Sequence, residues 1–310
     1  NRNAIILTQE QREAYEKLSS LASAKEASVS LLYGVTGSGK TSVYMSVIDR
    51  IIDEGKSVIV MVPEIGLTPQ TLSLFCERYG GNIAVFHSAL SIRERLEQWK
   101  RVKNGDAKII IGTRSAVFAP AENLGLIIVD EEQEHTYKSE QTPRYNAIDV
   151  ATYRAVYNKC LLLLASATPS VESYAAAQSG KYELCTLSKR YGNAVLPDVV
   201  TVDMRTEEKA QGSKAISRTL YKGLKETLES EKQSILLINR RGFHTFAACN
   251  SCGSVICCPH CSISMTYHSA NNRLMCHYCG HSVPFSSVCP ECGEDSVRYS
   301  GFGTQKIEDE

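Results

Sequence analysis

The feature that most constrains the fold of this chain is the glycine-rich run Gly34-Val35-Thr36-Gly37-Ser38-Gly39-Lys40-Thr41. It fits the G-x-x-x-x-G-K-[ST] phosphate-loop pattern, and it lies between an apolar run and a helix-like stretch, as that pattern requires. Glycines let backbone N–H groups turn toward phosphate oxygens, and the dipole of the following helix favours negative charge. We therefore predict an ATP site, with Lys40 on the β- and γ-phosphates and the Thr41 hydroxyl on Mg²⁺. The alternative is a glycine-rich turn formed by chance.

Short apolar runs alternate with helix-like stretches, such as Thr8–Ala22 and Ser91–Val102, through the first 175 residues. The runs are apolar throughout, which is typical of strands buried on both faces of a parallel sheet. They are Val29–Tyr33, Ser57–Val62, Ile83–Phe86, Lys108–Gly112, Leu126–Val129 and Leu161–Ala165. This βαβ series predicts an α/β, RecA-like lobe over residues 1–190, a parallel sheet with helices on both faces.

Two further segments belong to the predicted nucleotide site. The apolar run Leu126–Val129 ends in Asp130 and Glu131, and a strand end beside the phosphate loop is where an aspartate can hold Mg²⁺ through water. We assign Asp130 to the metal and Glu131 to the attacking water, so the predicted catalytic set is Lys40, Asp130 and Glu131. A solvated acidic turn is the alternative. Gln11, a short helix before the phosphate loop, is predicted to read adenine.

Polar residues also follow other predicted strands. The carboxyl ends of parallel strands lie at the functional edge of a doubly wound sheet. Thr68, Thr113 and Arg114 are therefore candidates to grip a nucleic-acid phosphate strand. Ser166 and Thr168 follow the last run, where small hydroxyl residues can link nucleotide state to lobe movement.

An aromatic-rich loop follows the acidic turn and carries Tyr137, Lys138, Arg144 and Tyr145. Stacking faces and cations on one polar loop suit unpaired bases and phosphates. The alternative is that the tyrosines pack the loop down as ordinary amphipathic residues.

Nine of the twelve cysteines fall between Cys249 and Cys292, with the spacing C-x2-C-x5-C-x2-C-x14-C-x2-C-x9-C-x2-C. Zinc takes four thiolates in a tetrahedron, so eight ligands predict two structural zinc sites, although spacing alone leaves open which pairs share a metal. The ligands are Cys249, Cys252, Cys258, Cys261, Cys276, Cys279, Cys289 and Cys292. A redox dithiol is the competing interpretation. Clustered pairs beside an ATPase pattern favour metal ligands in a reducing cytoplasm over a disulfide scaffold.

The rest of the chain predicts an incomplete second lobe. Residues 191–247 would hold a linker, a helix at Ser217–Leu228 and a buried strand at Ser234–Ile238. Residues 248–296 are the two-zinc module, and residues 297–310 return to the lobe.

The positive and negative side chains balance, because lysine plus arginine and aspartate plus glutamate both total 34. Nucleic-acid binding must therefore come from local patches. No apolar run reaches the roughly 18 residues of a membrane helix. The start of the chain is expected to be the cut end of a longer protein.

The order of these motifs resembles that of superfamily 2 helicases, and Asp130–Val150 resembles the acidic motif and aromatic-rich loop of the PriA family of primosomal helicases. Asn239-Arg240-Arg241-Gly242-Phe243 is similar to the same family, which adds Arg240 and Arg241 to the candidates for DNA contact or coupling. The chain departs from the family at Gln133, Ile148 and Gln305, where histidine, arginine and an acidic residue are common.

The resemblance covers essentially the whole chain and implies the central fragment of an ATP-dependent DNA helicase. It implies 3′-to-5′ movement and action at stalled or forked DNA in replication restart and primosome assembly. The implied partners are forked and single-stranded DNA, single-stranded DNA-binding protein and primosome loading factors, and we expect a cytoplasmic monomer. It also implies nested metal sites, an inner one and an outer one, made by Cys258, Cys261, Cys276 and Cys279 and by Cys249, Cys252, Cys289 and Cys292.

Later family motifs of the second lobe, including an arginine motif that completes the ATP site, are absent from the sequence. The isolated fragment is therefore expected to be inactive or weak. One rival is an ATP-driven translocase or remodeller that does not separate strands. Another is a non-enzymatic zinc-ribbon platform for DNA or partners, which the intact Lys40, Thr41, Asp130 and Glu131 disfavour.

Overall fold

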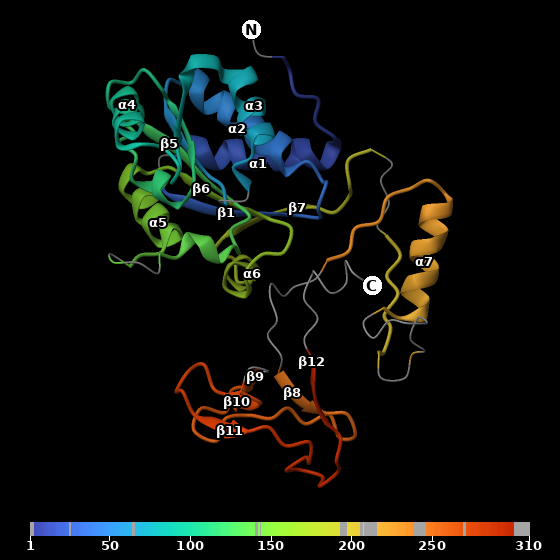
Figure 1. Ribbon diagram of the computed structural model, residues 1–310. Helices are drawn as coiled ribbons and strands as arrows, with labels where there is room; N and C mark the ends of the chain where they lie inside the picture. The colour runs from blue at the N-terminus through green and yellow to red at the C-terminus, as the bar shows by residue number, and fades with distance from the viewer. Residues whose placement is uncertain are drawn as a thin grey trace. The chain divides into compact units, whose positions relative to one another are not determined.

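The structure is a computed structural model that describes residues 3–24, 26–63, 66–139, 142, 144–192, 197–204, 207, 216–237, 246–268 and 271–300. The chain forms two compact units, Asn1–Leu196 and Pro197–Glu310 (Figure 1). Within the described ranges, none of the helices has the length and apolar character needed to cross a bilayer.

The first unit is built on a seven-stranded sheet in the order β3-β4-β2-β5-β6-β1-β7, and all neighbouring strands are parallel. The strands are β1 (Ser28–Gly34), β2 (Ser57–Met61), β3 (Ile83–Phe86), β4 (Ile109–Gly112), β5 (Leu124–Asp130), β6 (Leu161–Ser166) and β7 (Glu183–Leu187). This confirms the α/β parallel sheet that the apolar runs predict. The prediction misses β7, because its residues at the sheet edge mix exposed and buried side chains and form no continuous apolar run.

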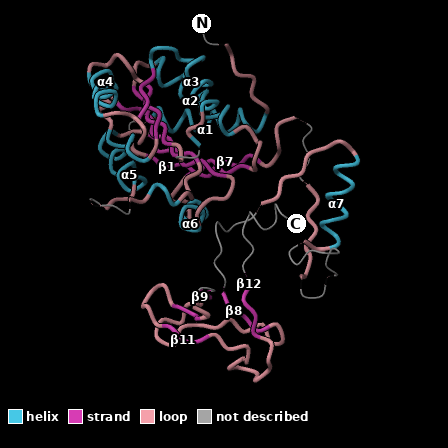
Figure 2. The backbone as a smooth tube through the Cα atoms, in the orientation of Figure 1, coloured by secondary structure: helices cyan, strands magenta, loops and turns pink. Residues whose placement is uncertain are grey.

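Successive residues of each strand enter two separate hydrophobic cores. In β6, Leu161 and Leu163 pack with residues of α1, α2 and α3, whereas Leu162 and Leu164 pack with residues of α4, α5 and α6 (Figure 2). Covering both faces explains why the runs are apolar throughout. The helices are α1 (Gln9–Ser23), α2 (Lys40–Asp53), α3 (Pro69–Tyr79), α4 (Ile92–Lys103), α5 (Ala147–Asn158) and α6 (Val171–Gln178), with short 3-10 turns η2 (Gly80–Asn82), η3 (Arg114–Phe118) and η4 (His135–Tyr137).

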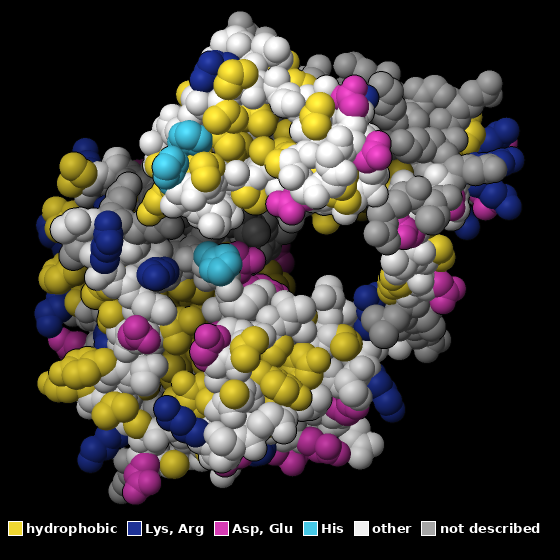
Figure 3. Space-filling model, turned by 90° about the horizontal axis from the view of Figure 1, so that it is seen from below, with side chains coloured by type: hydrophobic (Ala, Val, Ile, Leu, Met, Phe, Trp, Pro, Cys, Tyr) yellow, Lys and Arg dark blue, Asp and Glu magenta, His cyan; other side chains and the backbone are white. Residues whose placement is uncertain are grey.

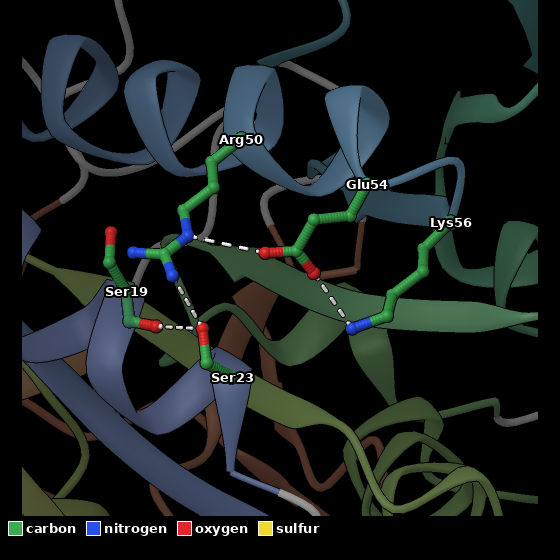
Figure 4. A network of polar contacts seen from close by, with 5 residues as sticks. All are labelled: Ser19, Ser23, Arg50, Glu54 and Lys56. Atoms are coloured by element: carbon green, nitrogen blue, oxygen red, sulfur yellow. Dashed lines mark hydrogen bonds and ion pairs between the residues drawn. The ribbon is translucent and has the colours of Figure 1, made fainter.

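Polar contacts join the last turns of α1 and α2 (Figure 4). Arg50 donates from Nε to Glu54 Oε1 at 3.3 Å and from Nη2 to Ser23 Oγ at 2.7 Å. Lys56 Nζ donates to Glu54 Oε2 at 2.8 Å, and Ser23 Oγ donates to the carbonyl oxygen of Ser19 at 2.9 Å. Surface ion pairs of this kind contribute about 0–1 kcal/mol each. The packing of α1 against α2 therefore rests mainly on their buried apolar faces.

The second unit contains α7 (Arg218–Glu229) and a small sheet in the order β11-β10-β9-β8-β12, with antiparallel neighbours. Its strands are β8 (Phe246–Cys249), β9 (Thr266–His268), β10 (Arg273–Met275), β11 (Ser282–Pro284) and β12 (Val297–Ser300). The helix begins after Ser217, whose Oγ accepts a hydrogen bond from the Leu220 N–H at 3.0 Å, as expected for the predicted helix Ser217–Leu228.

The strand expected over Ser234–Ile238 is a wrong prediction for the residues that the structure describes. Residues 234–237 have no regular secondary structure, and Ile238 lies outside the described residues. Ile235 and Leu237 are 94% and 92% exposed. A strand needs a neighbour for its backbone hydrogen bonds, and none of the described strands pairs with this segment. The apolar composition alone does not make a strand.

Candidate functional site

A cavity of about 710 Å³ lies where β1 and β5 end. It is lined by residues 4–6, the phosphate loop and the start of α2, the acidic turn after β5, and Tyr191. Lys40 is 9% exposed and donates from Nζ to the carbonyl oxygen of Gly34 at 2.9 Å, so its ammonium is held across the loop. Gly37 and Gly39 have φ angles of 79° and 81°, in the left-handed region that glycine adopts readily. The structure therefore gathers the residues that the sequence assigns to phosphate.

The acidic turn lies on the other side of this cavity. The Tyr44 hydroxyl donates to Asp130 Oδ2 at 3.2 Å, and the Glu131 N–H donates to Asp130 Oδ1 at 3.1 Å. Burial raises the pKa of Asp130, and the Glu131 carboxylate raises it further. Burial lowers the pKa of Lys40. The carboxylate of Asp130 and the hydroxyl of Thr41 are the hard oxygen donors that suit Mg²⁺, so the residues present fit a magnesium–nucleotide complex.

A hydrogen-bonded chain runs from the acidic turn to the end of β6. Gln133 Nε2 donates to Glu131 Oε2 at 2.9 Å, and Ser166 Oγ donates to Gln133 Oε1 at 2.6 Å. The Thr168 N–H then donates to Ser166 Oγ at 2.9 Å. Ser166 and Thr168, predicted as coupling residues, are thus connected to Glu131 through one amide side chain. Sequence reasoning noted Gln133 only as a departure from a family pattern and missed this bridge.

Glu132 is a second residue that sequence reasoning missed. Its side chain is 3% exposed, with Oε1 accepting from the Ser170 N–H at 2.7 Å and Oε2 from the hydroxyls of Ser170 and Ser173, each at 3.1 Å. A carboxylate at a helix N-terminus satisfies free N–H groups and interacts favourably with the dipole. Glu132 therefore fixes the acidic turn to the start of α6. The sequence signal is Glu132 in an acidic run, with Ser170 and Ser173 three residues apart.

Gln11, the predicted adenine reader, contacts the phosphate loop through its side chain. Its amide group is used inside the lobe, because Oε1 accepts from the Thr8 N–H at 2.9 Å and Nε2 donates to the carbonyl oxygen of Ser38 at 2.8 Å. The residue is 2% exposed. Gln11 also caps α1 together with Thr8. In this structure it supports the phosphate loop, and its role toward adenine stays a prediction.

Arg114 lies against the aromatic-rich loop. Its Nη1 donates to the carbonyl oxygens of Lys138 at 2.7 Å and Thr136 at 3.2 Å, and its Cζ lies 5.9 Å from the centre of the Tyr145 ring. The Tyr145 ring also makes an edge contact with Phe118, with ring centres 4.9 Å apart. The predicted phosphate contact Arg114 and the aromatic-rich loop are therefore in direct contact.

Tyr137 corrects the expectation of an exposed stacking ring. It is 2% exposed, and its hydroxyl lies 2.6 Å from the carbonyl oxygen of Asp130 and 3.1 Å from that of Met61. The ring packs in the core that contains α5, because β5 and η4 bring it over the sheet. Tyr137 therefore packs the loop down, as the alternative interpretation expects, while Lys138 and Arg144 are exposed.

The remaining candidates for DNA contact differ in accessibility. Thr68 is half-buried and caps α3 by accepting a hydrogen bond from the Thr71 N–H, and Thr113 is buried. Arg240 and Arg241 lie outside the described residues. On the face drawn in Figure 3, lysine and arginine side chains are interspersed with aspartate and glutamate. A basic stripe is not apparent on the described part of that face, which agrees with the zero net charge.

The cysteine module brings its thiols together in two groups. Within each group the sulfur atoms lie within 4.8 Å of one another, and the membership is the nested one: Cys249, Cys252, Cys289 and Cys292, and separately Cys258, Cys261, Cys276 and Cys279. The Sγ atoms of Cys249 and Cys292 are 3.6 Å apart, and those of Cys252 and Cys289 are 3.7 Å apart. Tetrahedral zinc with bonds of about 2.3 Å spaces its sulfurs by about 3.8 Å. The two groups fit zinc.

The local backbone of the module also suits metal ligation. Gly253, Gly280 and Gly293 have φ angles of 77°, 77° and 76°. Each donates its N–H to the carbonyl oxygen of a ligand cysteine four residues earlier at 2.9 Å. Ser262 takes the same place in the remaining knuckle with a φ of 56°.

Comparison with known proteins identifies both regions. The DEAD/DEAH box helicase family model matches residues 8–177, and the model of the PriA DNA helicase Cys-rich region matches residues 258–284. The chain is 47% identical over 304 residues to replication restart protein PriA of Bacillus subtilis, covering 98% of this chain and 38% of the relative. It is 45% identical over 307 residues to PriA of Chlamydia trachomatis, covering 97% of this chain and 41% of the relative.

The chain thus spans about two fifths of the length of these relatives. Among solved structures, RecG bound to a three-way DNA junction matches with a TM-score of 0.48 and 24% identity, covering 62% of this chain and 25% of that chain.

Proposed function

The chain belongs to the DEAD/DEAH box helicase family and is similar to replication restart PriA proteins along nearly its whole length. We propose that it is the ATP-hydrolysing and zinc-binding part of a replication restart helicase. The observation that carries the proposal is the cavity that joins the phosphate loop to Asp130 and Glu131. A glycine-rich turn or a solvated acidic turn would not require these segments to meet.

The proposed chemistry assigns each charged side chain a separate task. Lys40 neutralises the β- and γ-phosphates. To reach them, its ammonium must leave the carbonyl oxygen of Gly34, to which it now donates a hydrogen bond. Glu131 takes the proton of the attacking water. A bound Mg²⁺ would neutralise phosphate charge, and Asp130 and Thr41 are the residues that would hold it. Gln133 fixes the Glu131 carboxylate and relays its position to Ser166.

We propose that DNA acts on this chemistry through Arg114. Its guanidinium has two backbone carbonyl oxygens of the aromatic-rich loop as partners, and a DNA phosphate would compete with them for the same cation. Release of the loop would reach Asp130 through Tyr137, whose hydroxyl contacts the Asp130 carbonyl oxygen. Family resemblance supports 3′-to-5′ movement on single-stranded DNA at stalled or forked sites.

The cysteine module is proposed to be structural. Four cysteine ligands close each site and leave no position for a substrate. We propose that its surface binds forked DNA or protein partners, with single-stranded DNA-binding protein and primosome loading factors as the candidates. The protein would act as a monomer in the cytoplasm, where thiols remain reduced.

The proposal is tested with substitutions in the full-length protein. Lys40→Ala should abolish ATP binding or hydrolysis. Glu131→Gln should bind ATP but hydrolyse it very slowly, because water activation is lost while the phosphate contacts remain. Steady-state ATPase assays and nucleotide titrations measure the two effects. Normal turnover in Glu131→Gln would disprove its role.

Strand separation needs its own assay, because a translocase without unwinding would use the same ATP site. Displacement of a labelled strand from forked DNA should require ATP and be lost in Lys40→Ala. Displacement of a triplex-forming strand without separation of the duplex would instead identify a translocase.

A further inference from the structure

The cysteine module carries two pairs of neighbouring histidines, and the functions described above use neither pair. His260 and His281 pack edge to face, with ring centres 4.7 Å apart and ring planes at 80°. His268 and His277 have ring centres 5.1 Å apart and ring planes at 44°, and their Nε2 atoms are 3.1 Å apart. The second pair therefore directs two ring nitrogens at one another, as two ligands of one metal ion would be.

The second pair is brought together by the turn that follows β10. In the register of β9 and β10, the residue opposite His268 is Arg273, and His277 lies four residues further along the chain. Residues 277–279 form a turn, and this turn brings the His277 ring to His268. The guanidinium of Arg273 is engaged by β11, because it donates to Ser282 Oγ at 2.7 Å and to the Ser282 carbonyl oxygen at 2.9 Å.

His268 points away from the core of the module. The neighbouring Tyr267 packs against that core, and its ring centre lies 5.1 Å from that of Phe285. Successive side chains of a strand point to opposite faces, so the His268 ring lies on the other face. His268 is half-buried and His277 is exposed. An ion in water can therefore reach both ring nitrogens without opening the module.

The 3.1 Å spacing of the two Nε2 atoms suits two ligands of one ion. Zinc–nitrogen bonds of about 2.0–2.1 Å place two ligands about 3.3 Å apart in a tetrahedron and about 3.0 Å apart at a right angle. Imidazole is a preferred ligand of zinc, copper and nickel, and it binds through a neutral ring nitrogen. Two protein ligands leave further positions to water, so an ion held in this way exchanges readily.

We propose that His268 and His277 form a third metal site of the module, which binds an exchangeable divalent ion, zinc or nickel. The site differs from the two cysteine groups because its protein ligands are two nitrogens. His277 lies between Cys276 and Cys279 of the inner group, so an ion held there ties β9 to this knuckle. The inference goes beyond the proposed function and does not depend on ATP hydrolysis.

Nickel titration of the untagged, zinc-loaded chain tests the site. Dialysis against a weak chelator should remove exchangeable ions and leave two zinc ions in the cysteine groups. Isothermal titration should then show one nickel ion bound per chain, with the zinc content unchanged. His277→Gln should weaken nickel binding by at least about tenfold, because losing a residue that merely orients a metal ligand already costs about 10–100-fold. Glutamine can still donate a hydrogen bond to His268, so this variant separates metal binding from simple pairing of the two side chains.

The matched control is His260→Ala with His281→Ala, which removes two histidines from the same module and leaves the Nε2 pair in place. The control should bind one nickel ion with the affinity of wild type. Absence of nickel binding in wild type, or unchanged binding in His277→Gln, would overturn the proposal. Loss of nickel binding in a control that retains its two zinc ions would place the ion at the other pair and overturn it as well.

A second measurement needs no substitution and so does not depend on how a variant folds. Paramagnetic nickel broadens the resonances of nuclei close to it. The chain has seven histidines, and in wild-type protein with labelled histidine the ring signals of His268 and His277 should broaden first. Equal broadening of all seven, or earlier broadening of His260 and His281, would reject the site.

Hydrogen exchange tests the connection from β9 to the knuckle. The Cys276 N–H donates to the carbonyl oxygen of His281 at 2.8 Å, and the Gly280 N–H donates to that of Cys276 at 2.9 Å. At a nickel concentration about ten times the dissociation constant, binding to the folded module alone should slow the exchange of these two amides by about tenfold. In His277→Gln the same nickel concentration should have little effect. Unchanged exchange in wild type with nickel bound would show that the ion does not tie this knuckle to β9.

Discussion

The parallel-sheet lobe and the cysteine module obtain their stability from different sources. In the lobe, β6 is buried along its whole length, and helices cover both faces of the sheet. In the module, β8 to β12 are three or four residues long. Four of the eight fully buried residues in its core are the cysteines Cys249, Cys258, Cys276 and Cys289. The stability of the lobe depends on apolar burial, whereas the stability of the module depends on cysteine side chains that can bind metal.

Because their sources of stability differ, the two regions should respond to separate perturbations. Burial of apolar surface stabilises a region by roughly 25 cal/mol per Å² and needs many residues. A structural zinc site can stabilise a small region as much as the burial of many apolar side chains, and it needs only four ligands. Removing metal should therefore act on one region, and shortening an apolar side chain of the sheet should act on the other. The following experiments test that independence.

Metal removal should have the largest effect. Structural zinc contributes apparent folding free energies of about 10–16 kcal/mol in zinc-finger peptides. We expect purified protein to hold two zinc ions per chain, one for each group of four cysteines. A strong chelator should abolish hydrogen-exchange protection in residues 246–300 and preserve it in β1, β5 and β6. A zinc content of one, the presence of iron, or equal loss of protection in the sheet would contradict the view that only the module depends on two zinc ions.

Two adjacent cysteines offer a sharper version of the same test. Cys258 is buried and belongs to the inner group, whereas Cys257 is exposed and belongs to neither group. Cys258→Ser should release one zinc and cost about 3–5 kcal/mol or more in the module. Cys257→Ser should retain both ions. Zinc quantification together with mass spectrometry of the native protein distinguishes the two, and loss of zinc from Cys257→Ser would show that the nested grouping is wrong.

The sequence predicts both regions well where the determining interactions are local. Apolar runs locate six of the strands, because burial on both faces leaves a continuous signal. Cysteine spacing predicts eight ligands, because each knuckle is formed by neighbouring residues. The pairing of knuckles is not local, since Cys249 and Cys292 are far apart in sequence and meet through β8 and β12. Only the family resemblance implied it.

The missed features share this dependence on distant contacts. Gln11 looks like a free polar side chain in the sequence, and the Ser38 carbonyl oxygen that occupies its amide is 27 residues away. Tyr137 looks like a loop tyrosine, yet its hydroxyl partners include the carbonyl oxygen of Met61 on β2. Glu132 becomes an anchor through Ser170 and Ser173. Periodicity and spacing carry no information about such partners.

Cavity formation in the sheet should have an intermediate effect confined to the lobe. Ile128 on β5 is fully buried, and Ile128→Ala should cost about 2–5 kcal/mol because the surrounding core closes the space only in part. Ile263 in the module is 42% exposed, and Ile263→Ala should change stability by roughly 0.5 kcal/mol or less. Chemical denaturation followed by a lobe-specific signal measures the cost. Zinc content should be two in both variants.

Loss of one buried hydroxyl should have a smaller effect. Tyr137→Phe keeps the ring in the core and removes the contacts to the carbonyl oxygens of Asp130 and Met61. The expected cost is about 0.5–1.5 kcal/mol, the usual net contribution of a hydrogen bond. Tyr278→Phe in the module is the matched control, because Tyr278 is 83% exposed. Equal and negligible effects in thermal unfolding would mean that the Tyr137 hydroxyl does not hold the acidic turn.

Neutralising Asp130 should have the smallest effect on stability, and its sign is opposite to that of the other substitutions. Burial raises the pKa of Asp130 in the folded lobe, so folding favours the protonated carboxyl and the ionised form destabilises the lobe. Its stabilising contribution is fully present below the unfolded pKa of about 3.9 and is lost as pH rises through the folded value. Asp130→Asn should therefore raise the Tm of the lobe by a few degrees at neutral pH. The advantage over wild type should shrink as the pH falls toward the pKa of the unfolded carboxyl.

Asp106→Asn, at an exposed position of the same lobe, controls for a general change in charge. Metal-free protein without nucleotide is required, since a bound cation would reverse the effect by stabilising the ionised carboxylate. A lower Tm for Asp130→Asn at neutral pH would show that the ionised carboxylate is stabilised by Tyr44 and the Glu131 N–H more than burial penalises it, and the acidic turn would then be a structural feature of the lobe in its own right.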